Sequence, residues 1–145
     1  MRVLIVEDDY LQADWLGEIL REQLEGVEIE HIRSEQKFYD WLESSKGSPP
    51  DLIILDVMLR WTDPGSGISA PEEVRTGGYY RAGLRCEKLL RQLEESRSTP
   101  VILYTVLEAL DLGDDIDKIS AKSAYLGKSS DPSPLVEIAR RLLRR

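Results

Sequence analysis

Short apolar runs alternate with segments of helical periodicity along this sequence, and that alternation limits the possible folds more than any other feature. The runs cover residues 3–6, 27–32, 52–55, 101–105 and 124–126, of which 27–32 is the weakest. Residues 52–55 (LIIL) are all aliphatic, as in strands that are covered on both faces. Five strands separated by helices favour an α/β fold, with a parallel sheet and helices on both of its faces.

Apolar residues at helical spacing predict four helices. They cover residues 11–24, 34–42, 84–93 and 131–142. Ser34 is a suitable cap for the second helix, and Asp131-Pro132 begins the last one. The elements therefore follow each other as strand and helix in turn.

Three other segments have no clear period. Residues 44–50 form a loop by composition, and residues 107–121 are ambiguous, with acidic residues crowded on one side. Residues 60–78 contain several turn-forming residues, so we expect a long loop there. Loops of this length inside a domain are usually functional or mobile.

Composition limits the compartment and the partners. Nineteen Lys and Arg residues against 27 Asp and Glu residues give a net charge of −8, which argues against direct binding to nucleic acid. The single cysteine, Cys86, excludes an internal disulfide framework, and the aliphatic runs are too short to cross a membrane. Because the N-terminus also lacks the pattern of a signal peptide, we expect a cytoplasmic protein.

Charged and hydroxyl side chains stand where the predicted strands end. Glu7 and Asp8 follow the first strand, Asp56 follows the third, Thr105 ends the fourth and Lys128 follows the fifth. Ligands of open parallel sheets bind beyond the carboxyl ends of the strands. If the first and third strands are neighbours, these five side chains meet at one edge of the sheet.

Four segments, VLIVEDD, DLIILDVML, PVILYT and AYLGK, resemble in this order the receiver domain of bacterial two-component response regulators. The resemblance covers nearly the whole chain except residues 60–82. It implies a doubly wound, flavodoxin-like fold with a five-stranded parallel sheet in the order 2-1-3-4-5. We therefore expect one receiver domain over residues 1–145, with an inserted loop at about 60–82 after the third strand. Because the sequence ends directly after the last predicted helix, we expect no effector domain.

The resemblance implies a phosphoacceptor and a metal site. Asp56 would take a phosphoryl group from a phosphohistidine. Asp8, Asp56 and the backbone carbonyl of Met58 would ligate Mg²⁺, and Glu7 would act through a bound water. The three carboxylates carry a formal −3, which Mg²⁺ and Lys128 together balance, and Mg²⁺ prefers oxygen ligands of this kind.

The resemblance also implies how the phosphoryl group is recognised. Thr105 and Lys128 would contact its oxygens, and Tyr125 matches the position of an aromatic switch residue. A phosphoryl group adds about −1.5 to −2 units of charge, so moving Thr105 toward it would let Tyr125 turn and alter a docking face. Tyr125 and Thr105 could instead be ordinary strand residues, and Glu7, Asp8 and Asp9 simple charges at a helix N-terminus.

The implied partners are a histidine kinase or a histidine phosphotransfer protein as donor, and a downstream protein as target. The protein would be a monomer or a phosphorylation-dependent dimer. It would be a signalling domain and not an enzyme, apart from its part in its own phosphorylation and dephosphorylation. The main alternative is a phosphorylation-independent receiver-like module that binds proteins. A phosphohydrolase of the haloacid dehalogenase type is disfavoured, because Met58 stands where that family has a second Asp.

Three features depart from the receiver pattern. Ser129 follows Lys128 where proline is usual, which leaves the geometry of the lysine open. Val106 follows Thr105 where a small residue is usual, so we expect slower loss of the phosphoryl group. The insertion at 60–82 could be a lid, a recognition loop for a partner, or a tolerated surface excursion.

Overall fold

The five predicted strands form one parallel sheet in the order β2-β1-β3-β4-β5, as the resemblance implied. The strands are β1 (Arg2–Val6), β2 (Glu28–Ile32), β3 (Leu52–Leu55), β4 (Val101–Thr105) and β5 (Ser123–Gly127). The computed structural model describes residues 1–44 and 48–144. The loop expected at 44–50 therefore lies partly outside the described residues.

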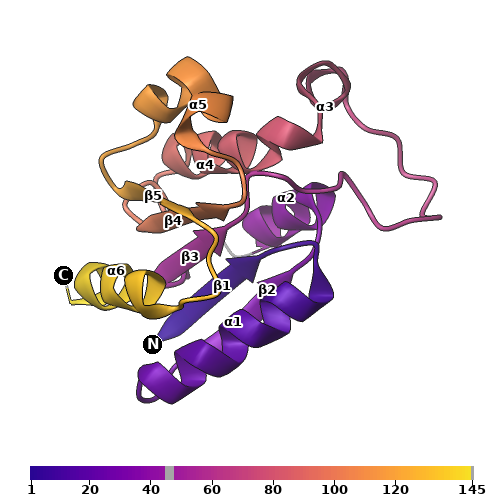
Figure 1. Cartoon of the computed structure of the whole chain (residues 1–145). Coiled ribbons are helices and arrows are strands. Elements are labelled where there is room, and N and C mark those ends of the chain that lie inside the picture. The colour runs from indigo at the N-terminus through magenta and orange to yellow at the C-terminus, as the bar shows by residue number, and fades with distance from the viewer. Residues whose placement is uncertain (45–47, 145) are drawn as a thin grey trace.

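All four predicted helices are present and cover both faces of the sheet (Figure 1). They are α1 (Tyr10–Gln23), α2 (Glu35–Ser44), α4 (Ala82–Gln92) and α6 (Ser133–Leu143). Ser34 caps α2 as predicted, since its Oγ accepts the N–H of Lys37 at 3.2 Å. Within the described part of the chain, no helix combines the length and the apolar character that crossing a membrane requires.

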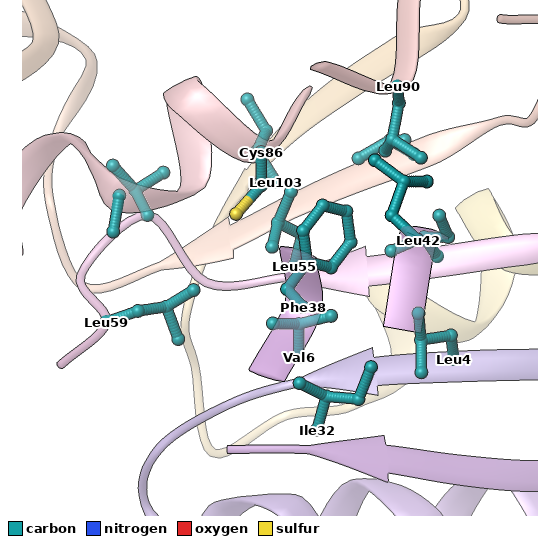
Figure 2. Packing of buried hydrophobic residues seen from close by; sticks show 14 of the residues in the cluster. Leu4, Val6, Ile32, Phe38, Leu42, Leu55, Leu59, Cys86, Leu90 and Leu103 are labelled. Carbon is teal, nitrogen blue, oxygen red and sulfur yellow. The ribbon is translucent and has the colours of Figure 1, made fainter. Parts of the chain in front are cut away.

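The sheet separates two apolar cores, one on each face. Side chains of α1 and α6 pack on one face, and side chains of α2 and α4 pack on the other. Figure 2 shows the second of these cores, where Phe38 of α2 and Cys86 of α4 lie against Leu55 and Leu103 of the sheet. β3 is buried along its whole length, and its residues alternate between the two cores. This is the double coverage that its aliphatic sequence predicts.

Residues 60–78 are not entirely a loop, which corrects the expectation from sequence. They contain the short helix α3 (Glu72–Gly77), and a 3₁₀ turn, η1 (Tyr79–Arg81), joins it to α4. Only Val74 of α3 is buried, so the helix leaves no periodic apolar pattern in the sequence. The ambiguous segment 107–121 forms another short helix, α5 (Ala109–Leu112), and a second 3₁₀ turn, η2 (Gly113–Lys118).

The insertion is attached to α2 at its start and to α4 at its end. The N–H groups of Glu35 and Gln36 donate to the carbonyls of Arg60 and Trp61, at 3.0 and 2.8 Å, which satisfies donors of the first turn of α2. Arg85 of α4 forms a buried bidentate pair with Glu35, at 2.7 Å for each bond. The same guanidinium donates to the carbonyl of Gly78 at 2.9 Å. The two ends of the insertion therefore meet at one buried ion pair.

Candidate functional site

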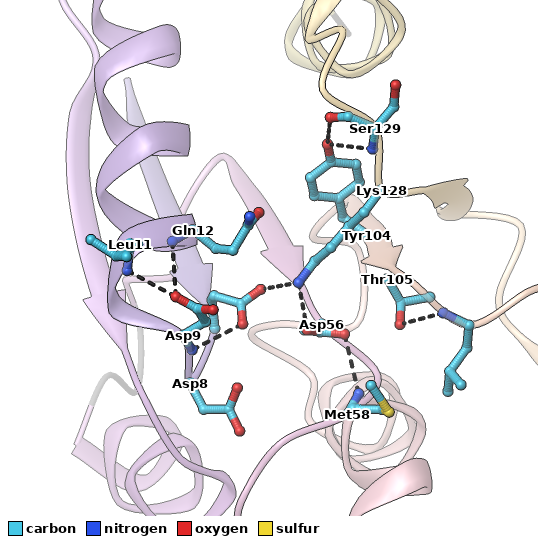
Figure 3. Close-up of polar contacts among 12 residues, drawn as sticks. Asp8, Asp9, Leu11, Gln12, Asp56, Met58, Tyr104, Thr105, Lys128 and Ser129 are labelled. Carbon is cyan, nitrogen blue, oxygen red and sulfur yellow. Dashed lines mark hydrogen bonds and ion pairs between the residues drawn. The ribbon is translucent and has the colours of Figure 1, made fainter.

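Residues from three strand ends meet at the carboxyl edge of the sheet. The Nζ atom of Lys128 lies 2.8 Å from Oδ2 of Asp56 and 2.5 Å from Oε2 of Glu7. Figure 3 shows the lysine side chain reaching across from the β5 side toward Asp56. Glu7 and Asp56 are almost fully buried, and Lys128 is only 12% exposed. Side chains that are distant in sequence thus form one compact charged cluster.

The sheet itself positions these three residues. Each lies just beyond its strand and adds one hydrogen bond to the parallel ladder. The bonds are Glu7 N–H to Ile32 O at 2.9 Å, Asp56 N–H to Val6 O at 2.9 Å, and Lys128 N–H to Thr105 O at 2.8 Å. The backbone from which each side chain projects is therefore held by a neighbouring strand.

Three carboxylates of this edge could hold a metal ion together. Glu7, Asp8 and Asp56 each offer one oxygen, and these three oxygens lie within 4.8 Å of one another. Hard oxygen donors of this kind fit Mg²⁺, which is commonly held by one or two carboxylates together with waters. The N–H of Met58 donates to Oδ1 of Asp56 at 3.2 Å, and the metal role of its carbonyl stays a prediction.

Burial and like charge change the acidity of this cluster. Loss of water and the negative charge of Asp56 raise the pKa of Glu7 from 4.5 to about 7, although Lys128 opposes the shift. Burial by itself would lower the pKa of Lys128, but the charges of Asp56 and Glu7 outweigh it and raise that pKa above its ordinary value. The lysine therefore stays charged. Its single positive charge does not balance the formal charges of the three neighbouring carboxylates.

Asp9 does not belong to the cluster. Its side chain caps α1 and accepts the N–H groups of Leu11 and Gln12, at 2.9 and 3.2 Å. The simple interpretation of the acidic run as helix-terminal charge is thus right for Asp9 alone. Asp8 instead accepts the backbone N–H of Arg60 at 3.0 Å, and the Arg60 guanidinium lies 3.8 Å away.

Thr105 and Tyr125 both contact the segment after β4. Thr105 is buried, and Figure 3 shows it on the opposite side of Asp56 from Asp8. Its Oγ1 accepts the N–H of Leu107 at 3.3 Å, and the Tyr125 hydroxyl donates to the carbonyl of Leu107 at 2.5 Å. Tyr125 is half-buried, and burial together with Glu108 and Asp111 raises its pKa.

Sequence reasoning missed three residues that shape the site. Arg60 contacts Asp8 from within the insertion, where no motif marks it. Gly83 of α4 donates to the carbonyl of Val57 at 2.9 Å, beside Asp56. The third is Tyr104, whose hydroxyl bonds to the backbone next to Lys128. A polar aromatic residue in an otherwise aliphatic strand was its only sequence signal.

No protein-family model and no curated protein sequence matches this chain. Solved structures do. The receiver domain of a signal transduction histidine kinase from Syntrophus aciditrophicus is 28% identical, with a TM-score of 0.72 over 99% of this chain and 89% of that one. A response regulator from Chloroflexus aurantiacus, described as putative, is 25% identical, with a TM-score of 0.70 over 99% of this chain and 98% of that one. The chain has the fold of a response regulator receiver domain.

A third similar structure concerns the metal. It is the receiver domain of a sensor histidine kinase from Pseudomonas aeruginosa, described with a magnesium ion coordinated in its active site cleft. It is 18% identical, with a TM-score of 0.72 over 99% of this chain and 98% of that one. The two receiver structures of 25% and 28% identity support a signalling domain rather than a classical enzyme.

Proposed function

We propose that this chain is a phosphoacceptor receiver that takes a phosphoryl group from a phosphohistidine onto Asp56, with Mg²⁺, and thereby switches a protein-docking face. The observation that carries the proposal is the junction of Lys128 with two carboxylates from other strands, at 2.5 and 2.8 Å. A buried lysine and three clustered acids have little structural value together, because burying charges costs free energy. They do suit the transfer of an anionic group.

Asp8 and Asp56 would hold Mg²⁺ directly, with the carbonyl of Met58, and Glu7 would act through a water. When bound, Mg²⁺ supplies positive charge that keeps the carboxylates ionised and offsets the charge of the transferring group. Burial and the charge of Asp56 raise the pKa of Glu7, and a cation held at this position would lower it again. The donor set therefore fits the ion.

Asp56 would supply the nucleophile. One carboxylate oxygen forms a bond to phosphorus while the nitrogen–phosphorus bond of the donor breaks, and the electron pair of that bond stays on the imidazole nitrogen. Lys128 already contacts Asp56, so its ammonium group can stabilise charge on the phosphoryl oxygens as the transfer proceeds. The hydroxyl of Thr105 would donate to one of those oxygens.

The docking switch would use the bonds around Leu107. If Thr105 turns toward the phosphoryl group, the N–H of Leu107 loses its acceptor, and the bond from Tyr125 to the Leu107 carbonyl is disturbed. The segment between β4 and η2 would then rearrange. The partners would be a histidine kinase or a histidine phosphotransfer protein as donor, and a downstream protein as target, in the cytoplasm.

The insertion would serve as a recognition loop. Tyr79 and Tyr80 at its end stack at 4.1 Å between ring centroids, and both are about half exposed, at 52% and 49%. The carbonyl of Tyr79 accepts the N–H of Leu59, so the pair stands close to the segment that follows Asp56. Tyrosine and other aromatic residues are enriched at protein interfaces.

Acetyl phosphate tests the phosphoacceptor role directly. The full chain is incubated with acetyl phosphate and Mg²⁺, and intact mass spectrometry measures the uptake of one phosphoryl group. We expect uptake by the wild type and none by Asp56→Asn or in excess chelator. A folded wild-type protein that takes up no phosphoryl group would overturn the proposal and favour the phosphorylation-independent module.

A further inference from the structure

The buried residue Tyr104 clamps the backbone beside Lys128. Tyr104 is the penultimate residue of β4, is 2% exposed and packs in the core beneath α1 and α6. Its hydroxyl donates to the carbonyl of Ser129 at 3.2 Å and accepts the N–H of the same residue at 3.4 Å. Figure 3 shows both bonds next to the lysine stem. One phenol thus satisfies both backbone groups of an exposed loop residue.

These two bonds complete a set that holds the lysine backbone from both sides. On the N-terminal side, Lys128 donates its own N–H to the carbonyl of Thr105 at 2.8 Å. On the C-terminal side, the next residue is fixed by Tyr104. Both anchors belong to consecutive residues of β4. The backbone from which the long, flexible lysine side chain starts is therefore fixed by a single strand.

Serine at position 129 leaves the backbone without the ring constraint of proline, and it also provides the N–H group that Tyr104 binds. Proline restricts its own backbone by its ring, and serine does not. Serine has a backbone N–H, which proline lacks, and this N–H is one of the two groups that Tyr104 binds. Two further hydrogen bonds hold the loop beyond Ser129. Ser129 Oγ accepts the N–H of Asp131 at 3.1 Å, and Asp131 Oδ1 accepts the N–H of Ser133 at 3.0 Å.

We infer that Tyr104 is a positioning residue for Lys128. Its hydroxyl holds the loop after β5 so that the ammonium group reaches Asp56 and Glu7. The catalytic consequence of this role rests on the proposed phosphoacceptor function, whereas the effect on the position of the lysine does not. The two can therefore be tested separately.

Chemical labelling tests the position without any phosphorylation. Tyr104→Phe removes the hydroxyl and keeps the ring, and brief acetic anhydride labelling followed by peptide mass spectrometry measures the reactivity of each lysine. We expect Lys128 to label several-fold faster in Tyr104→Phe, with exposed Lys37 and Lys88 unchanged as internal references. Tyr39→Phe is the matched control, because it also removes one tyrosine hydroxyl, which donates to the buried carboxylate of Glu35. It should leave the labelling rate of Lys128 as in the wild type. Equal labelling of Lys128 in Tyr104→Phe and wild type would overturn the inference.

A double-mutant cycle tests the consequence for phosphoryl transfer. Tyr104→Phe should slow phosphorylation by acetyl phosphate by about three- to thirtyfold, since small misplacements of reacting groups are costly. In a Lys128→Ala background, the same substitution should have no further effect. An equal loss in both backgrounds would mean that Tyr104 acts independently of Lys128 and would overturn the inference. If the wild type takes up no phosphoryl group while Lys128 labels faster in Tyr104→Phe, the proposed function fails and the positioning role stands.

Discussion

The hydroxyl groups of Thr105 and Tyr125 bind the two sides of one residue, Leu107. Thr105 accepts its N–H at 3.3 Å, and Tyr125 donates to its carbonyl at 2.5 Å. The two side chains come from neighbouring strands, and each contact depends on where the peptide at Leu107 lies. A displacement of Thr105 would therefore alter the hydrogen bond between Tyr125 and Leu107. This would be a short physical route from the proposed phosphoryl site to Tyr125 of β5.

Thr105→Val tests this route. Valine keeps the shape of threonine but cannot accept the Leu107 N–H or donate to a phosphoryl oxygen. In NMR spectra we expect the Leu107 amide of the wild type to shift when a phosphoryl analogue such as beryllium trifluoride is added with Mg²⁺. The shift should be much smaller in Thr105→Val and should persist in Thr105→Ser, which retains a hydroxyl. A full shift in Thr105→Val would remove Thr105 from the route.

The pKa of Glu7 predicts an unusual dependence of stability on pH. Because this pKa rises from 4.5 to about 7 on folding, the folded protein keeps a proton that the unfolded chain has already released between these values. The free energy of unfolding should therefore fall as pH rises from about 4 to about 8, by up to about 3 kcal/mol from this one group. Urea denaturation in chelator at several pH values measures it.

Glu7→Gln is the control for this pH effect, because glutamine does not titrate. Other carboxylates contribute slopes of their own, so the difference between wild type and Glu7→Gln isolates the contribution of Glu7. Mg²⁺ should reduce the difference, since a bound cation favours the ionised carboxylate. Parallel curves for the two proteins in chelator would show that the pKa of Glu7 is not raised.

Arg60 places a positive charge of the insertion beside a predicted metal ligand. Its guanidinium lies 3.8 Å from Oδ2 of Asp8 and would repel a divalent cation held by that carboxylate. Arg60→Ala should therefore bind Mg²⁺ about two- to fivefold more tightly at low salt, with a smaller gain at high salt. Isothermal titration calorimetry measures the affinity.

Arg97→Ala is the matched control for the loss of a guanidinium group. Arg97 pairs with exposed Glu94 at 3.5 Å, between the end of α4 and the start of β4, at the opposite edge of the sheet from the three clustered acids. Its removal should leave the Mg²⁺ affinity nearly unchanged. Weaker Mg²⁺ binding by Arg60→Ala would instead show that Arg60 holds Asp8 in place for the ion.

Strand ends could be predicted from the sequence, and the proximity of the charged side chains followed from them. The run LIILD identifies a buried strand and its last residue, and a parallel sheet brings such ends to one edge. Glu7, Asp56 and Lys128 were therefore expected together, and they do lie within hydrogen-bonding distance. Their roles in binding Mg²⁺ and phosphate stay predictions.

The path of the insertion could not be predicted, because local periodicity does not determine it. The helix α3 buries one side chain, Val74, and the insertion is held by carbonyl contacts to α2 and by the Arg85–Glu35 pair. The bonds from Tyr104 of β4 to Ser129, in the loop after β5, join residues 25 apart in the sequence. Such contacts depend on how packed elements meet, and no sequence period carries that information.

Gly83 is required by the close approach of α4 to the segment after β3. A Cβ atom at this position would lie 2.2 Å from the carbonyl oxygen of Asp56 and 2.6 Å from the Cα of Val57, and this backbone cannot move without displacing Asp56. Gly83→Ala should therefore lower the free energy of unfolding by about 1 to 3 kcal/mol and slow phosphorylation of Asp56.

Gly17→Ala in α1 is the contrasting variant, because its nearest neighbour is the flexible end of Arg21 at 3.3 Å. Alanine there should stabilise the helix by about 0.5 to 1 kcal/mol, and urea unfolding of both variants gives the comparison. A Gly83→Ala protein as stable as the wild type would show that α4 does not press on the Asp56 backbone.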